Sequence, residues 1–386
     1  MITVDEALAH VFALAAPLDT ETVPLRAATG RVLAEPVVAQ RAQPPFRASI
    51  MDGYAVAGDA KSYHVVGETA AGGPALEHLE LGQAVRVFTG APVPDGATRV
   101  VIQEDVVREN DTISLNANAD TQLYIRDIGR DFNVGDDIAA PRRVTPALVA
   151  LAAAMNAPEV TVSRRPKVAF IATGSELVMP GETPDPSQIV ASNGFALSAM
   201  AEAEGAEARL LPIAADTKES LEAAFALTEG ADLIVTIGGA SVGDYDLVGA
   251  VAANLGLDQA FYKIAMRPGK PLMAGRLNGT PMLGLPGNPV SSIVCGHIFM
   301  RPLLRAMQGL PAEPLPVQTG VLAAPIGPNG PRQHYMRATL NAGALTVADR
   351  QDSALLSVLA EANALVVRPP HDPEKAAGSV VSFIEF

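Results

Sequence analysis

The chain has 386 residues, too many for one ordinary hydrophobic core, so two to four domains are expected. Its formal net charge of −14 argues against a nucleic-acid-binding protein, because the basic residues are scattered rather than striped. One cysteine, Cys295, excludes an intramolecular disulfide and any cysteine-based zinc or iron–sulfur site. The six histidines never stand at HxxxH spacing, so a histidine metal site is not expected either.

The opening segment, MITVDEALAHVFALA, predicts an amphipathic helix with acidic residues in its first turn rather than a signal sequence. No apolar run is long enough to span a bilayer, so we expect a cytoplasmic protein without a membrane partner. Residues 44–133 are turn-rich, with alternating patches such as YHVVGET and AVRVFTG, and predict a β-rich unit. Thr145 and Pro146 then predict the start of a helix that ends near Asn156.

Residues 164–309 alternate apolar strands with helices. The predicted strands are KVAFIAT, RLLPIA, ADLIVTIGG and GTPMLGLPG. This alternation predicts a parallel sheet covered on both faces, and such sheets bind ligands at the carboxyl ends of their strands. The loops 173–176, 238–241 and 285–288 each follow a strand, so we expect them to line a binding site.

Residues 261–292 form the most informative segment, FYKIAMRPGKPLMAGRLNGTPMLGLPGNPVSS. Its basic residues Lys263, Arg267 and Lys270 precede a strand, a glycine loop and a helix start, where unpaired backbone N–H groups can face an anion. We therefore expect a phosphorylated or oxyanionic small molecule as ligand. The loops fit neither Walker A nor GxGxxG, which disfavours a standard ATPase or dinucleotide enzyme.

Acidic residues also follow the predicted strands. They are Glu176, Asp216, Asp244 and Asp246. Carboxylates beside phosphate-binding loops are typical of a magnesium site, since Mg²⁺ prefers a few oxygen ligands together with substrate phosphates. Each acid alone is equally well explained as a helix cap, and it is their shared location that favours the metal.

Six motifs, in order along nearly the whole chain, carry a family resemblance. They are RASIMDGYAV (47–56), FTGAPVPDGATRVVIQED (88–105), TGSE (173–176), GGASVGDYD (238–246), KIAMRPGKP (263–271) and GLPGNPVS (284–291). Together they resemble the molybdopterin molybdenumtransferase (MoeA) family, which is related to the E domain of gephyrin. The resemblance implies the last step of molybdenum cofactor synthesis: molybdate is inserted into adenylated molybdopterin, AMP leaves, and Mg²⁺ is required.

The resemblance also assigns roles residue by residue. The implied catalytic residues are Asp52, Thr89, Asp131, Glu176, Asp216 and Asp246. Glu176, Asp216 and Asp246 are also the implied magnesium ligands. The expected substrate-binding residues are Gly174, Ser175, Gly238, Gly239, Ser241, Lys263, Arg267, Lys270, Pro286, Gly287, Asn288, Pro289, Arg337 and Ser353. Among these, Lys263, Arg337 and Ser353 would hold molybdate, a tetrahedral dianion that needs several donors.

The sequence departs from the family pattern at three places. The usual GEDI-type motif appears as GRDF (129–132), so Arg130 replaces an acid while Asp131 keeps its place. The nearby GDDI (135–138) imitates the motif, but the glycine spacing favours Asp131. Arg267 stands where lysine is common, which retains the charge but not the geometry, and Ala240 replaces the usual valine.

The expected architecture is an α/β multidomain protein in four parts. Residues 1–43 with 134–163 form a discontinuous helical and extended linker domain, 44–133 a β-rich lid, 164–309 an α/β molybdopterin-binding domain, and 310–386 a small C-terminal β-barrel. The resemblance implies an elongated homodimer in which Asp52, Thr89 and Asp131 reach the partner's pterin site. It permits an adenylyltransferase and molybdoenzyme chaperones as further partners.

The sequence is also compatible with two other functions. One is a phosphoryl-transfer or adenylate-hydrolysing enzyme acting on a different pterin or nucleotide, which would not depend on molybdate. The other is a non-catalytic scaffold, which would have no physical reason to keep acids at strand ends. Taken alone, MDGYAV could also be a turn with Gly53 at positive φ and Tyr54 in the core, and Lys270 could be a solvated lysine.

Overall fold

The computed structural model describes residues 1–73, 76–239 and 247–386. The chain forms two compact units. The first unit comprises Met1–Glu21, Gly30–Ala34 and Val162–Phe386, and the second comprises Thr22–Thr29 and Glu35–Thr161. Within the described part of the chain, no helix combines the length and the hydrophobicity needed to cross a membrane. The predicted four-part division stays a prediction.

A six-stranded sheet with the order β18-β15-β19-β23-β22-β20 forms the centre of the first unit. The four parallel strands are β15 (Lys167–Ala172), β18 (Glu207–Leu210), β19 (Leu233–Ile237) and β23 (Thr280–Leu285). These are the four strands predicted from the sequence. Two further strands, β20 (Leu257–Tyr262) and β22 (Met273–Leu277), add antiparallel pairs, so the sheet is mixed rather than purely parallel.

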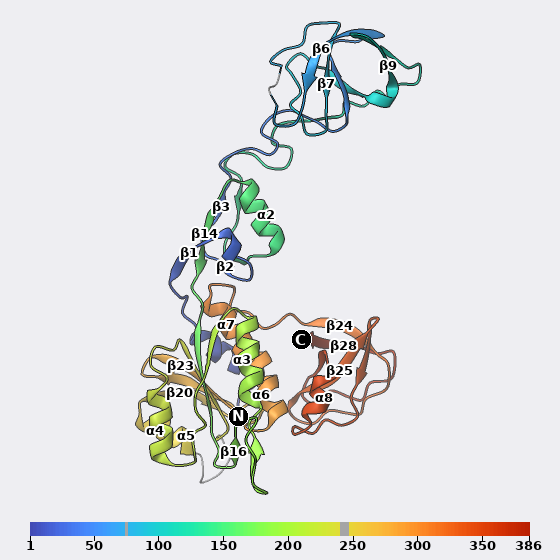
Figure 1. Ribbon diagram of the computed structural model, residues 1–386. Helices are drawn as coiled ribbons and strands as arrows, with labels where there is room; N and C mark the ends of the chain where they lie inside the picture. Colours follow the sequence, from blue (N-terminus) through green and yellow to red (C-terminus); the bar gives the residue numbers. More distant parts are fainter. Residues whose placement is uncertain (74–75, 240–246) are drawn as a thin grey trace. The chain divides into compact units, whose positions relative to one another are not determined.

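Helices cover both faces of this sheet (Figure 1). One face carries α1 (Val4–Ala13), α3 (Asn193–Ala203), α6 (Pro289–Cys295) and α7 (Arg301–Met307), with a π-helical turn, η3 (Gly296–Met300), between the last two. The other carries α4 (Lys218–Ala226) and α5 (Leu247–Asn254). Within β19, Val235 faces the first core and Ile234 the second, and neither is more than 2% exposed. This alternation explains why the strand is apolar throughout.

Local sequence signals account for the predicted helix starts. Thr3 caps α1 in a reciprocal capping box with Glu6, and the buried residues of α1 recur along one face, as an amphipathic helix requires. Thr145 caps α2 (Pro146–Ala154), whose first residue is proline, and Asn156 follows the helix in the left-handed conformation. Both predicted helices are confirmed. Cys295 is fully buried, as expected for a core thiol.

The C-terminal part of the first unit is a closed barrel. Its strands are β24 (Gln318–Leu322), β25 (Gln333–Asn341), β26 (Ala344–Val347), β27 (Ala364–Arg368) and β28 (Val380–Glu385). They run β25-β26-β24-β28-β27, and the pairing of β27 with β25 closes the ring. The short strand β21 (Met266–Arg267) from the basic loop pairs with the start of β25, and the short helix α8 (Leu356–Ala360) lies between β26 and β27 in the chain. The predicted C-terminal barrel is confirmed.

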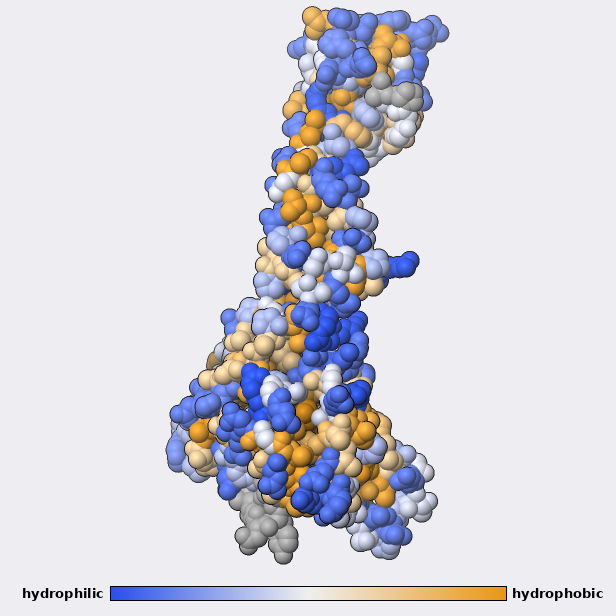
Figure 2. Space-filling model, turned by 90° about the vertical axis from the view of Figure 1, so that its left-hand side faces the viewer, coloured by the Kyte–Doolittle hydropathy of each residue, from blue (hydrophilic) through white to orange (hydrophobic). Residues whose placement is uncertain are grey.

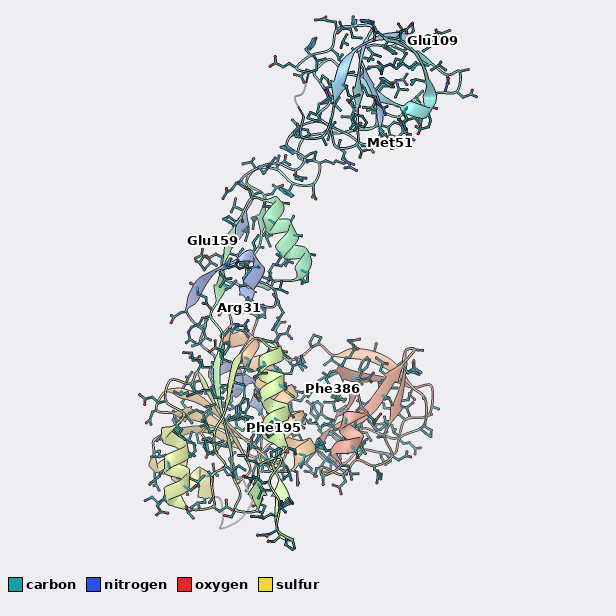
Figure 3. All side chains as sticks on the ribbon, in the orientation of Figure 1. Arg31, Met51, Glu109, Glu159, Phe195 and Phe386 are labelled. Carbon is teal, nitrogen blue, oxygen red and sulfur yellow. The ribbon has the colours of Figure 1, made fainter. Side chains whose placement is uncertain are left out.

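The barrel also contacts the helices of the α/β part. The ring of Phe386, the last residue, lies 4.7 Å from the ring of His297 on η3, centroid to centroid. Figure 3 shows Phe386 at the end of barrel strand β28 and Phe195 on α3.

The surface carries some exposed apolar side chains. Phe195 is 43% exposed. Figure 2 shows that apolar residues on the visible face are interspersed with hydrophilic ones. Scattered exposed apolar side chains of this kind are normal for a folded protein.

The second unit is β-rich, as predicted. Its main sheet has the order β8-β5-β7-β6-β10-β9. The strands are β5 (Gly53–Val56), β6 (Ser62–Thr69), β7 (Gln83–Val87), β8 (Arg99–Ile102), β9 (Val106–Glu109) and β10 (Thr112–Leu115). Tyr54 is buried, but Gly53 does not have a positive φ. Glycine is needed there because a Cβ would lie 2.0 Å from the carbonyl oxygen of Val101 on the neighbouring strand.

Short strands and 3₁₀ turns complete the fold. They are β1 (Thr20–Pro24), η1 (Leu25–Ala27), β2 (Val32–Leu33), β3 (Val37–Val38), β4 (Ala48–Ser49), η2 (Gln103–Asp105), β11 (Ile125–Arg126), β12 (Asp137–Ile138), β13 (Arg142–Arg143), β14 (Glu159–Ser163), β16 (Leu177–Val178) and β17 (Ile189–Val190). The strands pair as a sheet of order β1-β14-β2-β13 and as the pairs β11-β4, β12-β3 and β16-β17.

Candidate functional site

A cavity of about 970 Å³ lies at the carboxyl ends of β15, β19 and β23. Its wall combines the loops that follow these strands with the starts of α3 and α6. The predicted residues that line it are Gly174, Glu176, Asp216, Gly238, Gly239, Pro286, Gly287, Asn288 and Pro289. A parallel sheet brings these loops to one edge, which is why segments more than a hundred residues apart meet here. The volume is large enough for a small-molecule ligand.

The glycines of this wall allow the loops to pack closely. Gly238 has φ 95°, and a Cβ there would lie 2.7 Å from the carbonyl oxygen of Thr173. A Cβ on Gly287 would lie 3.5 Å from the Cα of Gly238, so the second and third glycine loops are neighbours. Any side chain at Gly238 would therefore separate β15 from β19 at the edge that forms the cavity.

The first two predicted acids face the cavity on adjacent loops. Asp216 and Ser175 are linked reciprocally: the Ser175 amide donates to Asp216 Oδ2 over 3.2 Å, and the Ser175 hydroxyl accepts from the Asp216 amide over 3.0 Å. Glu176 is next to Ser175 in the chain, and Glu176 and Asp216 both line the wall. The predicted residues Ser241, Asp244 and Asp246, together with Ala240, lie outside the described residues.

A hard cation such as Mg²⁺ would suit the oxygen donors of Glu176 and Asp216. Two carboxylates on neighbouring loops are consistent with the usual protein contribution to such a site, where substrate phosphates supply further oxygens. Among residues 1–73, 76–239 and 247–386, no group of three or more His, Cys, Asp or Glu residues is arranged to hold a metal ion. The magnesium site therefore stays a prediction.

Three polar residues of the cavity were missed by the sequence analysis: Ser192, Asn193 and Ser291. Asn193 begins α3, and its Nδ2 donates to the carbonyl oxygen of Gly287 over 2.7 Å, while Ser192 Oγ donates to Asn193 Oδ1. The start of α3 is thereby bound to the third glycine loop. A sequence signal existed, because Ser-Asn stands immediately before an apolar periodic stretch and marks a helix start.

The helix start at α6 is less open than predicted. Asn288 and Pro289 precede and begin the helix, as expected, but the amide of Val290 donates to the carbonyl oxygen of Ser353 over 3.1 Å. The Nδ2 of Asn288 also donates to Ser353 Oγ over 3.2 Å. A loop of the barrel therefore occupies one of the N–H groups that were predicted to face an anion.

The basic residues lie beside the cavity rather than in its wall. Lys263 adopts φ 74°, a left-handed conformation that is strained for a residue with a side chain, and its ammonium lies 5.1 Å from the centre of the Tyr262 ring. Arg267 and Lys270 are exposed. Pro271, directly after this loop, does line the cavity. The basic loop 263–270 therefore borders the cavity through its neighbour Pro271.

Arg337 is buried, with 1% of its surface exposed, although the family resemblance predicts that it binds molybdate. Its Nε donates to Gln351 Oε1, its Nη1 to the carbonyl oxygens of Asp352 and Leu355, and its Nη2 to that of Arg350. Burial lowers the pKa of Arg337, an effect that Asp352 opposes. Direct contact between Arg337 and the oxyanion stays a prediction.

The predicted residues of the second unit form a separate cluster. Asp52 Oδ1 accepts hydrogen bonds from the Thr89 amide over 2.7 Å and from the Thr89 hydroxyl over 2.9 Å. These bonds, with a smaller contribution from the nearby charge of Arg86, lower the pKa of Asp52. Met51, labelled in Figure 3, marks this position in the unit. Asp131 and Arg130 are both exposed. The pair of Asp52 and Thr89 therefore presents a preformed anionic group.

Comparison with known proteins decides the family. Residues 2–156 match the family model described as MoeA N-terminal region (domain I and II), residues 169–306 that described as "Probable molybdopterin binding domain", and residues 319–386 that described as MoeA C-terminal region (domain IV). Molybdopterin molybdenumtransferase 2 of Mycobacterium tuberculosis is 38% identical over 377 residues, which cover 93% of each chain. The chain belongs to the MoeA family. The family predicted from the six motifs is confirmed.

Other MoeA relatives agree. The molybdopterin molybdenumtransferase of a Nostoc species is 38% identical over 306 residues, covering 76% of this chain and 70% of the relative. Two structures of MoeA proteins of molybdopterin biosynthesis from Pyrococcus horikoshii superpose with TM-scores of 0.84 and 0.81, at 29% and 27% identity. Both superpositions cover all of this chain. They cover 99% of the first Pyrococcus chain and 100% of the second. The predicted MoeA fold is thereby confirmed.

A pH-dependent contribution to stability is expected from His334, the second residue of barrel strand β25. His334 is 6% exposed, and burial, assisted by the charge of Arg267, lowers its pKa from 6.5 to about 4. Between pH 4 and pH 6.5 the unfolded chain binds more protons at His334 than the folded chain does. The stability that the neutral, buried His334 allows is therefore fully present above about pH 6.5 and is lost as the pH falls towards 4. Urea unfolding at pH 7 and pH 5 should show a smaller loss of stability in His334→Gln than in the unchanged protein.

Exposed His64 provides the matched control for this comparison. His64→Gln should retain the pH dependence of the unchanged protein. Equal pH dependence in all three proteins would show that His334 makes no linked contribution.

Proposed function

We propose that this MoeA protein inserts molybdate into adenylated molybdopterin with release of AMP, the final step of molybdenum cofactor biosynthesis. The observation that carries the proposal is the cavity of about 970 Å³. It lies within the segment matched by the molybdopterin-binding model, and acids and glycine loops line its edge. The similarity over most of the chain to proteins named molybdopterin molybdenumtransferase supports the same activity. We also propose a cytoplasmic location.

In this proposal the glycine loops receive the pterin and its phosphate. Gly174, Gly238 and Gly287 let the main chain approach the ligand, and Asn193 holds the third loop against the start of α3. Ser175 and Asp216 join the first glycine loop to the loop that follows β18 through their reciprocal bonds. The protein's contribution is thus mainly to position two anionic substrates next to each other.

Glu176 and Asp216 would hold the magnesium ion, with Asp246 as the further proposed ligand. When bound, the ion would neutralise the charge of the pyrophosphate linkage. Without a cation, the carboxylates of Glu176 and Asp216 would repel a phosphate at this edge. The proposed cradle for molybdate contains Lys263 and Ser353, and Arg267 and Lys270 supply positive charge nearby.

We further propose that the protein acts as a homodimer in which Asp52, Thr89 and Asp131 serve the partner's cavity. The cavity residues all belong to the first unit, whereas Asp52, Thr89 and Asp131 belong to the second. The hydrogen bonds between Thr89 and Asp52 hold the Asp52 carboxylate in place, so it would bring a fixed negative charge to the reacting groups. An adenylyltransferase that supplies the adenylated pterin and chaperones of molybdoenzymes are the proposed further partners.

The activity itself can be tested with purified protein, adenylated molybdopterin and magnesium. AMP release should require molybdate, because the proposed reaction couples cleavage of the anhydride to metal insertion. Release that proceeds equally well without molybdate would favour an adenylate-hydrolysing enzyme. Absence of release under all conditions would favour a non-catalytic scaffold.

Asp52→Asn should lower the rate of AMP release by at least about a hundredfold, the scale for a positioned catalytic group. The asparagine Oδ1 can still accept the bonds from Thr89, so the loop should stay folded while the charge is lost. Asp59→Asn, an exposed acid of the same unit, is the control and should leave the rate unchanged. Near-normal turnover in Asp52→Asn would make MDGY a structural turn.

The dimer can be tested by mixing variants. Asp52→Asn and Glu176→Gln proteins should each be weak, and subunit exchange should partly restore AMP release, since one hybrid site then has both acids intact. Mass spectrometry of differently tagged chains would confirm the exchange. No recovery after confirmed exchange would place both acids in the site of one chain.

A further inference from the structure

Arg86 on β7 lies beside the Asp52 segment in the main sheet of the second unit. In the pairing of β7 with β5 its partner is Tyr54, so the two side chains lie on the same face of the sheet. The guanidinium carbon lies 5.1 Å from the centre of the Tyr54 ring and 5.0 Å from that of the Phe88 ring. Two aromatic rings therefore contact the guanidinium, an arrangement that suits its flat, delocalised charge.

The guanidinium also connects β5 to the segment that follows β8. Its Nη1 donates to the carbonyl oxygen of Gly53 over 3.2 Å, and its Nη2 donates to Gln103 Oε1 over 2.5 Å. The amide of Gln103 in turn donates to the carbonyl oxygen of Asp52 over 3.1 Å. The carbonyl oxygens of Asp52 and Gly53 are therefore both bound, the first by Gln103 and the second by Arg86.

Arg86 joins the two segments that carry Asp52 and Thr89. Thr89 follows Arg86 closely on the same segment, and its amide and hydroxyl both donate to Asp52 Oδ1. The hydrogen bonds from Arg86 to Gly53 and Gln103 lie at the base of this contact. A displacement of either segment would separate Asp52 from Thr89, so the bonds of Arg86 and those of Thr89 support each other.

The charge of Arg86 acts on Asp52 as well. Both acceptors of its hydrogen bonds, a backbone carbonyl and a side-chain amide, are neutral. The bonds from the Thr89 amide and hydroxyl lower the pKa of Asp52 most, and the positive charge of Arg86 lowers it further. Among the described residues, Arg86 is the charged group that acts on Asp52 in this way. Arg86 and Thr89 therefore favour the same fixed, ionised carboxylate.

We propose that Arg86 is a positioning residue for the reaction, which joins the segment of Asp52 to the segment of Thr89 and thereby holds the Asp52 carboxylate in place. Its effect on AMP release is exerted through Asp52. The kinetic half of this inference rests on the proposed function, because it uses the role of Asp52 in AMP release. The structural half can be measured without any substrate.

Amide hydrogen exchange, followed by NMR in the substrate-free protein, tests the structural half. Arg86→Met keeps an apolar side chain between the two rings and removes the charge and both hydrogen bonds. The Thr89 amide, which donates to Asp52, should then exchange about tenfold faster, whereas amides of β15 in the first unit should not change. Unchanged exchange at Thr89 would overturn the proposal.

Arg99→Met is the matched control. Arg99 is a half-buried arginine on β8 of the same sheet, and its guanidinium donates to the carbonyl oxygen of Asp120 rather than to the Asp52 segment. Arg99→Met should leave both the exchange of the Thr89 amide and the rate of AMP release unchanged. Equal acceleration of exchange in both variants would show a general loosening of the sheet and would overturn the positioning role.

The ionisation of Asp52 gives a second readout without substrate, which a purely structural arginine would not move. Carbon-13 NMR can follow the side-chain carboxyl signals, and the Asp52 signal is identified by its absence in Asp52→Asn. In Arg86→Met the titration midpoint of Asp52 should move to higher pH, because the variant removes a positive charge and loosens the bonds from Thr89, both of which favour the ionised form. An unmoved midpoint would count against the proposal.

A double-mutant cycle tests the kinetic half. Arg86→Met should lower the rate of AMP release at saturating substrate by at least about tenfold, since small displacements of a catalytic group have effects on this scale. If Arg86 acts through Asp52, the double variant should stay within about threefold of Asp52→Asn, because the effects of coupled residues are not additive. Effects that multiply would mean that Arg86 acts on the substrates directly, and would overturn the proposal.

These outcomes separate the inference from the proposed function. Faster exchange at Thr89 together with an unchanged rate of AMP release in Arg86→Met would overturn the proposal. The rate of Asp52→Asn then shows where the error lies. A slow Asp52→Asn protein would mean that Arg86 does not hold Asp52 for the reaction, whereas a normal rate would place the error in the proposed role of Asp52.

Gln103→Ala takes the place of Arg86→Met if that variant fails to fold. It removes one acceptor of the Arg86 guanidinium at an exposed side chain and leaves the charge of Arg86 and the backbone amide of Gln103 in place. Exchange at Thr89 should again be faster than in the unchanged protein. Full protection of the Thr89 amide in Gln103→Ala would contradict the proposal.

Discussion

Parallel pairing of β15, β19 and β23 is the constraint on which the site depends. Strands that run in the same direction end at the same edge, and each of these ends in a glycine-containing loop. Burial on both faces fixes the register, because a one-residue shift would exchange the residues that face α3 and α6 with those that face α4 and α5. The positions of Gly174, Gly238 and Gly287 therefore follow from the packing of the strands behind them.

Much of this arrangement could be predicted because the signals are local. Apolar runs identified the four parallel strands, and Thr145 with Pro146 identified a helix start. The hairpin of β22 and β23 was missed, although Asn278 and Gly279 between them both have positive φ and form a typical two-residue hairpin turn. The Pro- and Gly-rich basic loop in front of β22 made the whole segment look like a loop.

The site was harder to predict where long-range contacts determine the role of a residue. The sequence around Arg337 contains nothing that indicates burial, because its hydrogen-bond acceptors come from residues 350–355. The amide of Val290 looked free at a helix start, and only tertiary structure brings Ser353 to it. By contrast, Asp52 and Thr89, which come from two separate motifs, do meet through a carboxylate and a hydroxyl, and their role in catalysis stays a prediction.

The strand β21 has a consequence for how the chain can be divided. Met266 and Arg267 pair with Gln333 and His334, so the barrel receives part of its hydrogen bonding from the basic loop of the α/β part. A fragment that starts at residue 310 would lack this partner and expose backbone groups along the start of β25, an open strand edge that can pair with other chains. The α/β part expressed alone would lose the strand pairing of Arg267 with His334. Gene truncation at the apparent domain border would therefore damage both halves.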